Sequence, residues 1–183
     1  MSKKRFLLAL AAVGAFCAGI TVASAPSIAG DTEFRLGIYD HDSKLFASRH
    51  ETNSPDVNLE ALFRSPAWLA WAGAPRPTLG ATINTGHGTS LGYAGLTWTW
   101  DVTDAFFLEG GFGGAVHNGE LNNTAKRKRA FGCRANFHEN LSAGFRINES
   151  NSIMLTVEHM SNASLCDENQ GITNVGVRYG ISF

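Results

Sequence analysis

The chain has 183 residues, with 15 basic and 16 acidic side chains, six histidines and a formal net charge of −1. This length fits one domain, and the balanced charge gives no argument for a nucleic-acid partner, which a strong basic excess would suggest. Beyond the N-terminal region, no stretch is long and apolar enough for a membrane-spanning helix. A position in a membrane would therefore require a closed β-barrel, in which every backbone polar group has a partner.

Residues 1–29 have the three parts of a secretory signal peptide. They comprise a basic start, an apolar run over residues 6–22, and small side chains at Ser27 and Ala29, which are the −3 and −1 positions of a cleavage site. A membrane anchor is the alternative, but the apolar run is short for one. We expect the signal peptide to be cleaved after Ala29 and residues 30–183 to form a single domain outside the cytoplasm.

Eight segments of the remaining chain alternate between apolar and small or polar residues, which is the period-two pattern of a β-strand with two different faces. Eight strands of roughly membrane-spanning length make the smallest usual outer-membrane barrel. We therefore expect an all-β fold, an eight-stranded antiparallel transmembrane barrel. The apolar positions, in chain order, are Phe34, Leu36 and Ile38; Val57, Leu59, Ala61 and Phe63; Leu79, Ala81 and Ile83; Leu96, Trp98 and Trp100; Phe106, Leu108 and Phe112; Leu141, Ala143, Phe145 and Ile147; Ile153, Leu155 and Val157; and Val175, Val177, Tyr179, Ile181 and Phe183.

The opposite face of these segments carries the charges. Inside a small barrel opposite charges can pair, whereas each one facing lipid would cost about 2–4 kcal/mol near the midplane. The apolar face is therefore the predicted lipid face. A soluble β-domain would have the apolar face inside, but the signal peptide, Trp98, Trp100 and the terminal Phe183 favour a membrane barrel. The charged residues predicted to lie inside are Arg35, Glu60, Arg64, Glu109, Arg146, Glu158 and Arg178.

An even number of strands places both termini in the periplasm. Cys133 and Cys166 then lie in two different loops on the same, outer side of the barrel. A pair of cysteines in an oxidising compartment predicts a disulfide, and two free thiols are the alternative. The predicted outer loops are residues 40–56, 85–90, 115–137 and 162–171.

A histidine and a serine continue the lipid-facing phase of the seventh segment. His159 and Ser161 follow Val157 in steps of two, so we expect both to face outward near the outer rim, about 7 Å apart. An imidazole that accepts a hydroxyl proton makes serine able to attack an ester, provided that a third group orients the ring and donors stabilise the oxyanion. On spacing alone, two rim residues in contact with headgroups are the alternative.

The residues around this pair form a longer motif. His159-Met160-Ser161-Asn162-Ala163 is followed by Asn169-Gln170-Gly171-Ile172 and by a last strand ending in Phe183. This pattern resembles the lipid A 3-O-deacylase family (PagL type), and segments 96–100, 107–113 and 136–139 resemble family segments as well. The resemblance implies an outer-membrane esterase that removes the acyl chain ester-linked at position 3 of lipid A, with its active site toward the outer leaflet, where lipopolysaccharide resides.

By motif position, the resemblance implies roles for individual residues. Ser161 would be the nucleophile, His159 the general base, and Asn162 with Asn169 the oxyanion donors. The acidic position of the family falls on Thr173, two places after the motif glycine. Its hydroxyl can accept a hydrogen bond from the ring but supplies no charge.

Three acidic residues near the motif are candidates to supply the missing charge. Glu168 and Asp167 lie in the adjoining loop and would serve if that loop folds back, whereas Glu158 adjoins the histidine but points inward by alternation. A slower serine–histidine dyad, or loss of activity, are the other possibilities.

A basic run, Lys126-Arg127-Lys128-Arg129, lies in the longest predicted outer loop. It would bind the phosphates of lipid A or its sugar core, or it is a solvated run of loop charges. His41, between Asp40 and Asp42, is more typical of a loop than of a metal site, and no other spacing suggests a metal. We expect neither metal nor cofactor.

The predicted function is therefore serine–histidine hydrolysis of the 3-O-linked acyl chain of lipid A. A non-catalytic small outer-membrane barrel with a structural or adhesion role is the alternative, and Thr173 is the residue that favours it. An acyl-chain transferase would need an interior pocket, against which the bulky charged interior argues.

Overall fold

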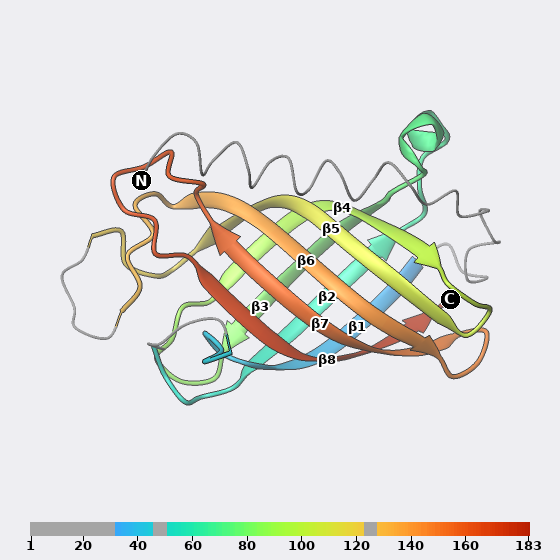
Figure 1. The fold of residues 1–183 in the computed structure, drawn as a ribbon, viewed down its shortest axis with the longest axis horizontal. Coiled ribbons are helices and arrows are strands. Elements are labelled where there is room, and N and C mark those ends of the chain that lie inside the picture. The colour runs from blue at the N-terminus through green and yellow to red at the C-terminus, as the bar shows by residue number, and fades with distance from the viewer. Residues whose placement is uncertain (1–31, 46–50, 123–127) are drawn as a thin grey trace.

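The computed structural model describes residues 32–45, 51–122 and 128–183. The predicted signal peptide lies outside these ranges. The described residues form eight antiparallel strands, each hydrogen-bonded to its neighbours in sequence, and β1 pairs with β8 to close the barrel (Figure 1). The strands are β1 (Thr32–Asp40), β2 (Asp56–Phe63), β3 (Arg76–Asn84), β4 (Leu91–Asp101), β5 (Phe106–His117), β6 (Ala135–Arg146), β7 (Asn151–Ser161) and β8 (Ile172–Ser182).

One short 3-10 helix, η1 (Ala67–Ala72), lies in the connection between β2 and β3. It ends at Gly73, whose φ of 84° is the left-handed conformation that glycine adopts without steric cost. The indole Nε1 of Trp98 donates a hydrogen bond to the carbonyl of Ala72 at 2.8 Å, which holds the helix against β4. In the part of the chain that the structure describes, no helix has the length and apolar character needed to cross a membrane.

The outer surface of the barrel is apolar, as predicted. On β1 the exposed fractions of Phe34, Leu36 and Ile38 are 55%, 56% and 66%, whereas the alternating Glu33 and Arg35 are buried. The other strands repeat this arrangement, with large apolar side chains on the outside. A surface of this kind fits a hydrocarbon environment rather than water.

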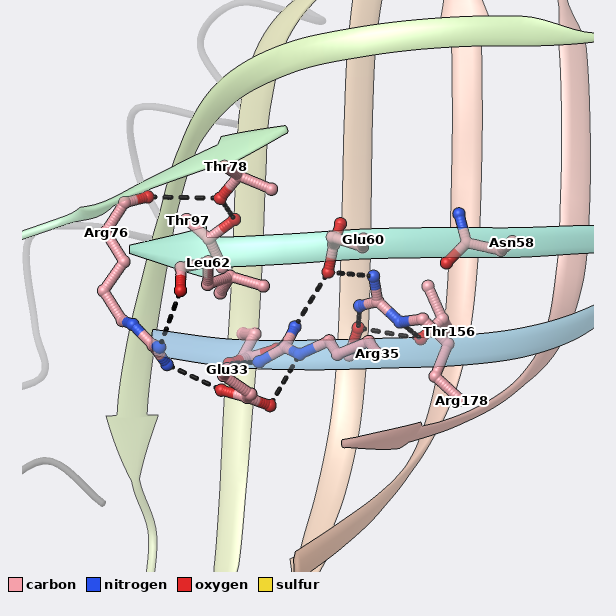
Figure 2. A network of polar contacts seen from close by, with 12 residues as sticks. Glu33, Arg35, Asn58, Glu60, Leu62, Arg76, Thr78, Thr97, Thr156 and Arg178 are labelled. Carbon is pink, nitrogen blue, oxygen red and sulfur yellow. Dashed lines mark hydrogen bonds and ion pairs between the residues drawn. The ribbon is translucent and has the colours of Figure 1, made fainter. Parts of the chain in front are cut away.

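A network of ion pairs fills the interior (Figure 2). The guanidinium of Arg35 pairs with Glu33 at 2.7 Å, with Glu60 at 3.1 Å and with Glu109 at 2.8 Å, while Arg178 reaches Glu60 at 2.7 Å. Each of these ions would cost several kcal/mol if buried alone. Pairing across β1, β2, β5 and β8 offsets that cost and fixes the inward phase of the strands.

Of the charges predicted to lie inside, one lies elsewhere and one keeps the inward phase but lies at the rim. Arg64 follows the end of β2 and is exposed, because the ladder between β1 and β2 stops at the pair Thr32 and Phe63. Arg146, the last residue of β6, is half-buried and pairs with Asp101 at the rim. Strand ends, which periodicity locates poorly, explain both differences.

Four connections gather at one end of the barrel, hereafter the loop end, opposite the C-terminus (left in Figure 1). The predicted third outer loop is shorter than expected, because the pairs Ala115 with Asn136 and Val116 with Ala135 extend the ladder between β5 and β6. Asp40 and Asp56, also predicted in a loop, belong to β1 and β2 for the same reason. The observed connections are residues 41–55, 85–90, 118–134 and 162–171.

The predicted disulfide is confirmed. Cys133 and Cys166 are bonded, with 6.0 Å between their Cα atoms, and they join the connection before β6 to the connection before β8. Further bonds link the same two connections: the amide of Gln170 donates to the carbonyl of Ala130 at 3.0 Å, and the side chain of Gln170 accepts from the amide of Ala130 at 3.2 Å. The disulfide and these hydrogen bonds therefore join the two connections into one layer.

Candidate active site

His159 and Ser161 lie at the end of β7 that reaches the loop end, on the outward phase that Leu155 and Val157 begin. This placement agrees with the prediction. Leu155 is exposed, whereas His159 and Ser161 are half-buried, because they lie next to the layer formed by the two disulfide-linked connections. The pair thus lies where the apolar wall of the barrel meets its loops.

Thr173 holds the imidazole from the neighbouring strand. It opposes His159 in the ladder between β7 and β8, and its Oγ1 lies 2.8 Å from Nδ1 of His159. With the proton on Nδ1, the ring donates to the threonine and Nε2 has the free lone pair that a general base needs. A hydroxyl therefore occupies the place at which a catalytic triad has a carboxylate.

A glycine leaves room for the ring and the serine to meet. Gly171 has a φ of +61°, and a Cβ there would lie 3.2 Å from Cε1 of His159 and 3.4 Å from Cβ of Ser161. Both side chains thus border the same position. Among the described residues no hydrogen bond between Ser161 and His159 is recorded; bonds of this kind commonly tighten only in the substrate complex.

Asn162, predicted as an oxyanion donor, has another role in the structure. Its Nδ2 donates to the carbonyls of Phe131 and Glu168, each at 2.6 Å. Its backbone amide donates to Oδ1 of Asn169 at 2.9 Å. Since both bonds donated by its side-chain amide hold the connections together, Asn162 has a structural role here, and its assignment as an oxyanion donor stays a prediction.

Asn169 remains available as a donor. Its Nδ2 makes one long bond of 3.3 Å to Oγ of Ser164, and no other described residue accepts from its second N–H. Ala163 and Ser164 have φ values of 52° and 65°, and the amide of Leu165 donates to the carbonyl of Asn162 at 3.0 Å. Residues 162–165 thus form a turn with two left-handed central residues. The turn follows Ser161 directly and leads the chain back toward Asn169.

Among the described residues, no hydrogen bond or ion pair joins His159 to any of the three candidate substitute acids. Glu158 points inward as predicted, where its carboxylate pairs with His138 at 3.0 Å. Glu168 contributes its backbone carbonyl to the bond with Asn162, and in the described part of the chain no hydrogen bond or ion pair joins its side chain to His159. Asp167 is exposed.

Another acidic residue, which was not predicted, lies opposite the histidine in the ladder between β6 and β7. Glu139 is the register partner of His159 on β6, on the same outward face. Its Oε2 is buried and has no hydrogen-bond partner among the described residues. The period of two, continued back from Leu141, would have placed Glu139 on the lipid face, but the sixth strand was expected to begin at Leu141.

The basic run is only partly described, because Lys126 and Arg127 lie outside the described residues. Lys128 donates from Nζ to the carbonyl of His87. Arg129 forms a bidentate pair with Asp42, with both N–O distances 2.8 Å. A guanidinium held in this way stabilises the contact between two connections, which differs from the predicted contact with substrate phosphates.

The same contact includes a buried histidine. The His41 ring lies 2.9 Å from Asp56 and 3.2 Å from Glu51. Burial disfavours the charged ring, but the hydrogen bonds to both carboxylates outweigh it and raise the pKa of His41 to about 9. Burial likewise opposes the charge of Glu51, yet the bonds from His41, Arg129 and Thr89 lower the pKa of Glu51 to about 2.

Comparisons with known proteins agree on a family and a fold. The family model described as lipid A 3-O-deacylase (PagL) matches residues 49–182. The crystal structure of the outer membrane enzyme PagL is 19% identical, with a TM-score of 0.62 over 82% of this chain and 99% of that one. No curated protein matched the sequence.

Two other solved barrels share the fold at low identity. The N-terminal β-barrel domain of Pseudomonas aeruginosa OprF is 7% identical, with a TM-score of 0.51 over 83% of this chain and 96% of that one. A de novo designed transmembrane β-barrel is 12% identical, with a TM-score of 0.50 over 86% of this chain and 98% of that one. The architecture is thus that of a transmembrane barrel of the outer membrane.

Proposed function

Because the chain belongs to the lipid A 3-O-deacylase (PagL) family, we propose that it hydrolyses the acyl ester at position 3 of lipid A with Ser161 as nucleophile and His159 as general base. Family membership makes the chain a carboxylic ester hydrolase of the outer membrane. The serine–histidine mechanism and the residues that carry it are the proposal.

The proposed reaction uses the two side chains in turn. Oγ of Ser161 attacks the ester carbonyl while its proton passes to Nε2 of His159. The negative charge on the carbonyl oxygen of the tetrahedral intermediate takes a hydrogen bond from Nδ2 of Asn169. Collapse of the intermediate breaks the ester bond, and the imidazolium gives its proton to the departing sugar oxygen, which becomes a hydroxyl.

Water then completes the cycle. His159 accepts a proton from a water molecule, which attacks the acyl-Ser161 ester; the second intermediate collapses, and the serine recovers its proton as the free 3-hydroxy fatty acid leaves. The site faces outward at the loop end of an apolar wall. A substrate whose acyl chains lie along the barrel would bring its ester to this height, and the outer leaflet holds such a substrate.

The observation that carries the mechanism is the 2.8 Å contact between Nδ1 of His159 and Thr173. It fixes the ring by the nitrogen that does not face the chemistry, and it leaves Nε2 to act as the base. A histidine that merely touched headgroups would need no such partner.

The test is the mass spectrum of lipid A from cells that express the protein and make fully acylated lipid A. We expect the loss of one 3-hydroxyacyl unit, and we expect Ser161→Ala and His159→Asn to abolish that loss. Ser150→Ala changes an exposed serine in the turn between β6 and β7 and serves as the matched control. Unchanged lipid A with a correctly inserted wild-type barrel would favour a non-catalytic barrel with a structural or adhesion role.

A further inference from the structure

The charge that Thr173 lacks is present on the other side of the histidine. His159 lies between two register partners on the outward face, Thr173 on β8 and Glu139 on β6. Side chains directly opposite in an antiparallel ladder have Cβ atoms about 4.5–5.5 Å apart. A glutamate at that distance can place its carboxylate next to an imidazole.

We propose that the two functions of a triad acid are divided here, so that Thr173 orients His159 while Glu139 supplies the negative charge that stabilises the imidazolium. This inference rests on the proposed function, because it concerns the same reaction. Glu139 is a positioning residue that acts through His159, and it exchanges no proton with the substrate.

The surroundings of Glu139 leave its charge available. Oε2 is buried and has no hydrogen-bond partner among the described residues. A buried carboxylate oxygen without a partner is costly, and a cation that forms beside it relieves that cost. His138, the next residue along β6, faces the interior and is committed to Glu158.

The proton transfers of the proposed reaction agree with this division of roles. When Oγ of Ser161 attacks the ester, its proton moves to Nε2 of His159, and the ring becomes a cation. The carboxylate of Glu139 keeps its charge throughout, and its attraction for the ring is strong because protein and hydrocarbon, rather than bulk water, surround the pair. When the ring protonates the departing sugar oxygen, the cation disappears and the histidine is neutral again.

The acids of the adjoining connection are less suited to this role. The backbone of Glu168 is tied by Asn162 and lies against Gly132, where a Cβ would come 2.9 Å from the Glu168 amide nitrogen. The disulfide at Cys166 further restrains this connection. The backbone of Glu168 is therefore fixed within this connection, whereas Glu139 lies directly opposite His159 in the barrel wall.

The experiment measures kcat and KM for lipid A deacylation by the mature barrel in detergent micelles. Glu139→Gln keeps the shape of the side chain and removes its charge, and we expect kcat to fall roughly 100-fold with KM changed less than about threefold, as for loss of one electrostatic contribution to the transition state. Glu139→Asp keeps the charge and is expected to retain more of kcat. Glu120→Gln, which changes an exposed glutamate at the loop end, is the matched control.

A second substitution tests whether a carboxylate at another position beside the ring can replace that of Glu139. Thr173→Glu restores a carboxylate beside Nδ1 of His159, so we expect it to raise kcat at least tenfold more in the Glu139→Gln background than in the wild type. An equal gain in both backgrounds would overturn the inference. Heat-modifiable gel migration verifies that each variant is a folded barrel.

The outcomes separate this inference from the proposed function. If Ser161→Ala and His159→Asn are inactive while Glu139→Gln keeps kcat within threefold of the wild type, the division of roles is wrong and the hydrolase mechanism stands. If Ser161→Ala remains active, both are wrong. A loss in Glu139→Gln that Thr173→Glu rescues supports both.

Discussion

Nδ1 of His159, near the end of β7, lies 2.8 Å from Oγ1 of Thr173, near the start of β8. A threonine hydroxyl can accept the ring proton and so select one tautomer, but it cannot balance the positive charge that the ring gains during general-base catalysis. The contact therefore separates orientation of the histidine from stabilisation of its charge.

Removal of this hydroxyl should affect the rate more than binding. Thr173→Val keeps the shape of the side chain and removes the acceptor, so we expect kcat to fall roughly tenfold, since general acid–base catalysis depends on a correctly placed base. KM should change little. Thr173→Ser, which keeps a hydroxyl, should retain most of the activity, and equal rates for the valine and serine variants would contradict an orienting role.

The two asparagines of the motif should respond differently to alanine. Asn169→Ala removes the candidate oxyanion donor, so we expect a roughly 100-fold lower kcat with a barrel that migrates normally on gels. Asn162→Ala breaks the bonds to Phe131 and Glu168 and leaves their carbonyls without this partner. We therefore expect faster protease cleavage of the connections in Asn162→Ala, measured by limited proteolysis, and a smaller loss of protection in Asn169→Ala, which removes only the bond from the Asn162 amide and the long bond to Ser164.

The opposite pattern would return the oxyanion role to Asn162. Normal protease resistance in Asn162→Ala, together with the larger loss of kcat, is the result that would do so.

Alternation along the strands predicted the wall of the barrel and the direction of the site. Arg35 inside and Ile38 outside follow from a period of two and from the cost of a charge in hydrocarbon. The same alternation predicted that His159 and Ser161 lie on the outward face. These predictions succeeded because a shift of one residue would reverse every side chain of a strand.

Contacts between loops carry no such period, and there the sequence was less informative. The pair of Arg129 with Asp42 and the bonds of Asn162 depend on how two connections fold over the end of the barrel. Glu139 was missed for a different reason, since β6 begins at Ala135 whereas the alternation was followed only from Leu141. Its importance comes from being opposite His159, and register between strands is set by the whole barrel rather than by either segment.

The disulfide should stabilise the layer beside the active site. Cys133 and Cys166 are 33 residues apart. A cross-link over a loop of that length raises the free energy of the unfolded chain by about 3–4 kcal/mol, because it reduces the conformational entropy of that chain. We expect the double variant Cys133→Ser/Cys166→Ser, or the reduced wild type, to lose protease resistance at the connections while the barrel stays closed. Reductant should not change the double variant.

Activity should fall less than stability in that experiment, because the bonds from Asn162 still hold the connection that follows Ser161. Thiol titration of the unfolded, unreduced mature protein provides the independent measurement. Two reactive thiols before reduction would contradict the disulfide.

The contact between His41, Glu51 and Asp56 should depend on pH at both ends of the neutral range. The folded pKa of His41 is about 9, above its usual value of 6.5, so its stabilisation is complete below about pH 6.5 and is lost as the pH rises through 9. The folded pKa of Glu51 is about 2, below its usual value of 4.5, so its stabilisation is present above about pH 4.5 and is lost as the pH falls through 2.

The connections should therefore be most stable between about pH 4.5 and 6.5. The shift for His41 corresponds to about 3 kcal/mol, and the shift for Glu51 reports largely the same interaction, so the two should not be added. Hydrogen exchange at the amide of Thr89, which donates to Glu51 at 2.8 Å, measures the opening directly once the intrinsic dependence on pH is removed. We expect protection to fall between pH 6.5 and 9.5 in the wild type.

His41→Gln removes the titrating ring and should abolish that fall, with low protection already at pH 6. His87→Gln changes an exposed histidine in the neighbouring connection and should leave the profile as it is in the wild type. If His41→Gln kept the same decline above pH 6.5, another group would have to be titrating, and the assignment of the charge to the ring between Asp56 and Glu51 would be wrong.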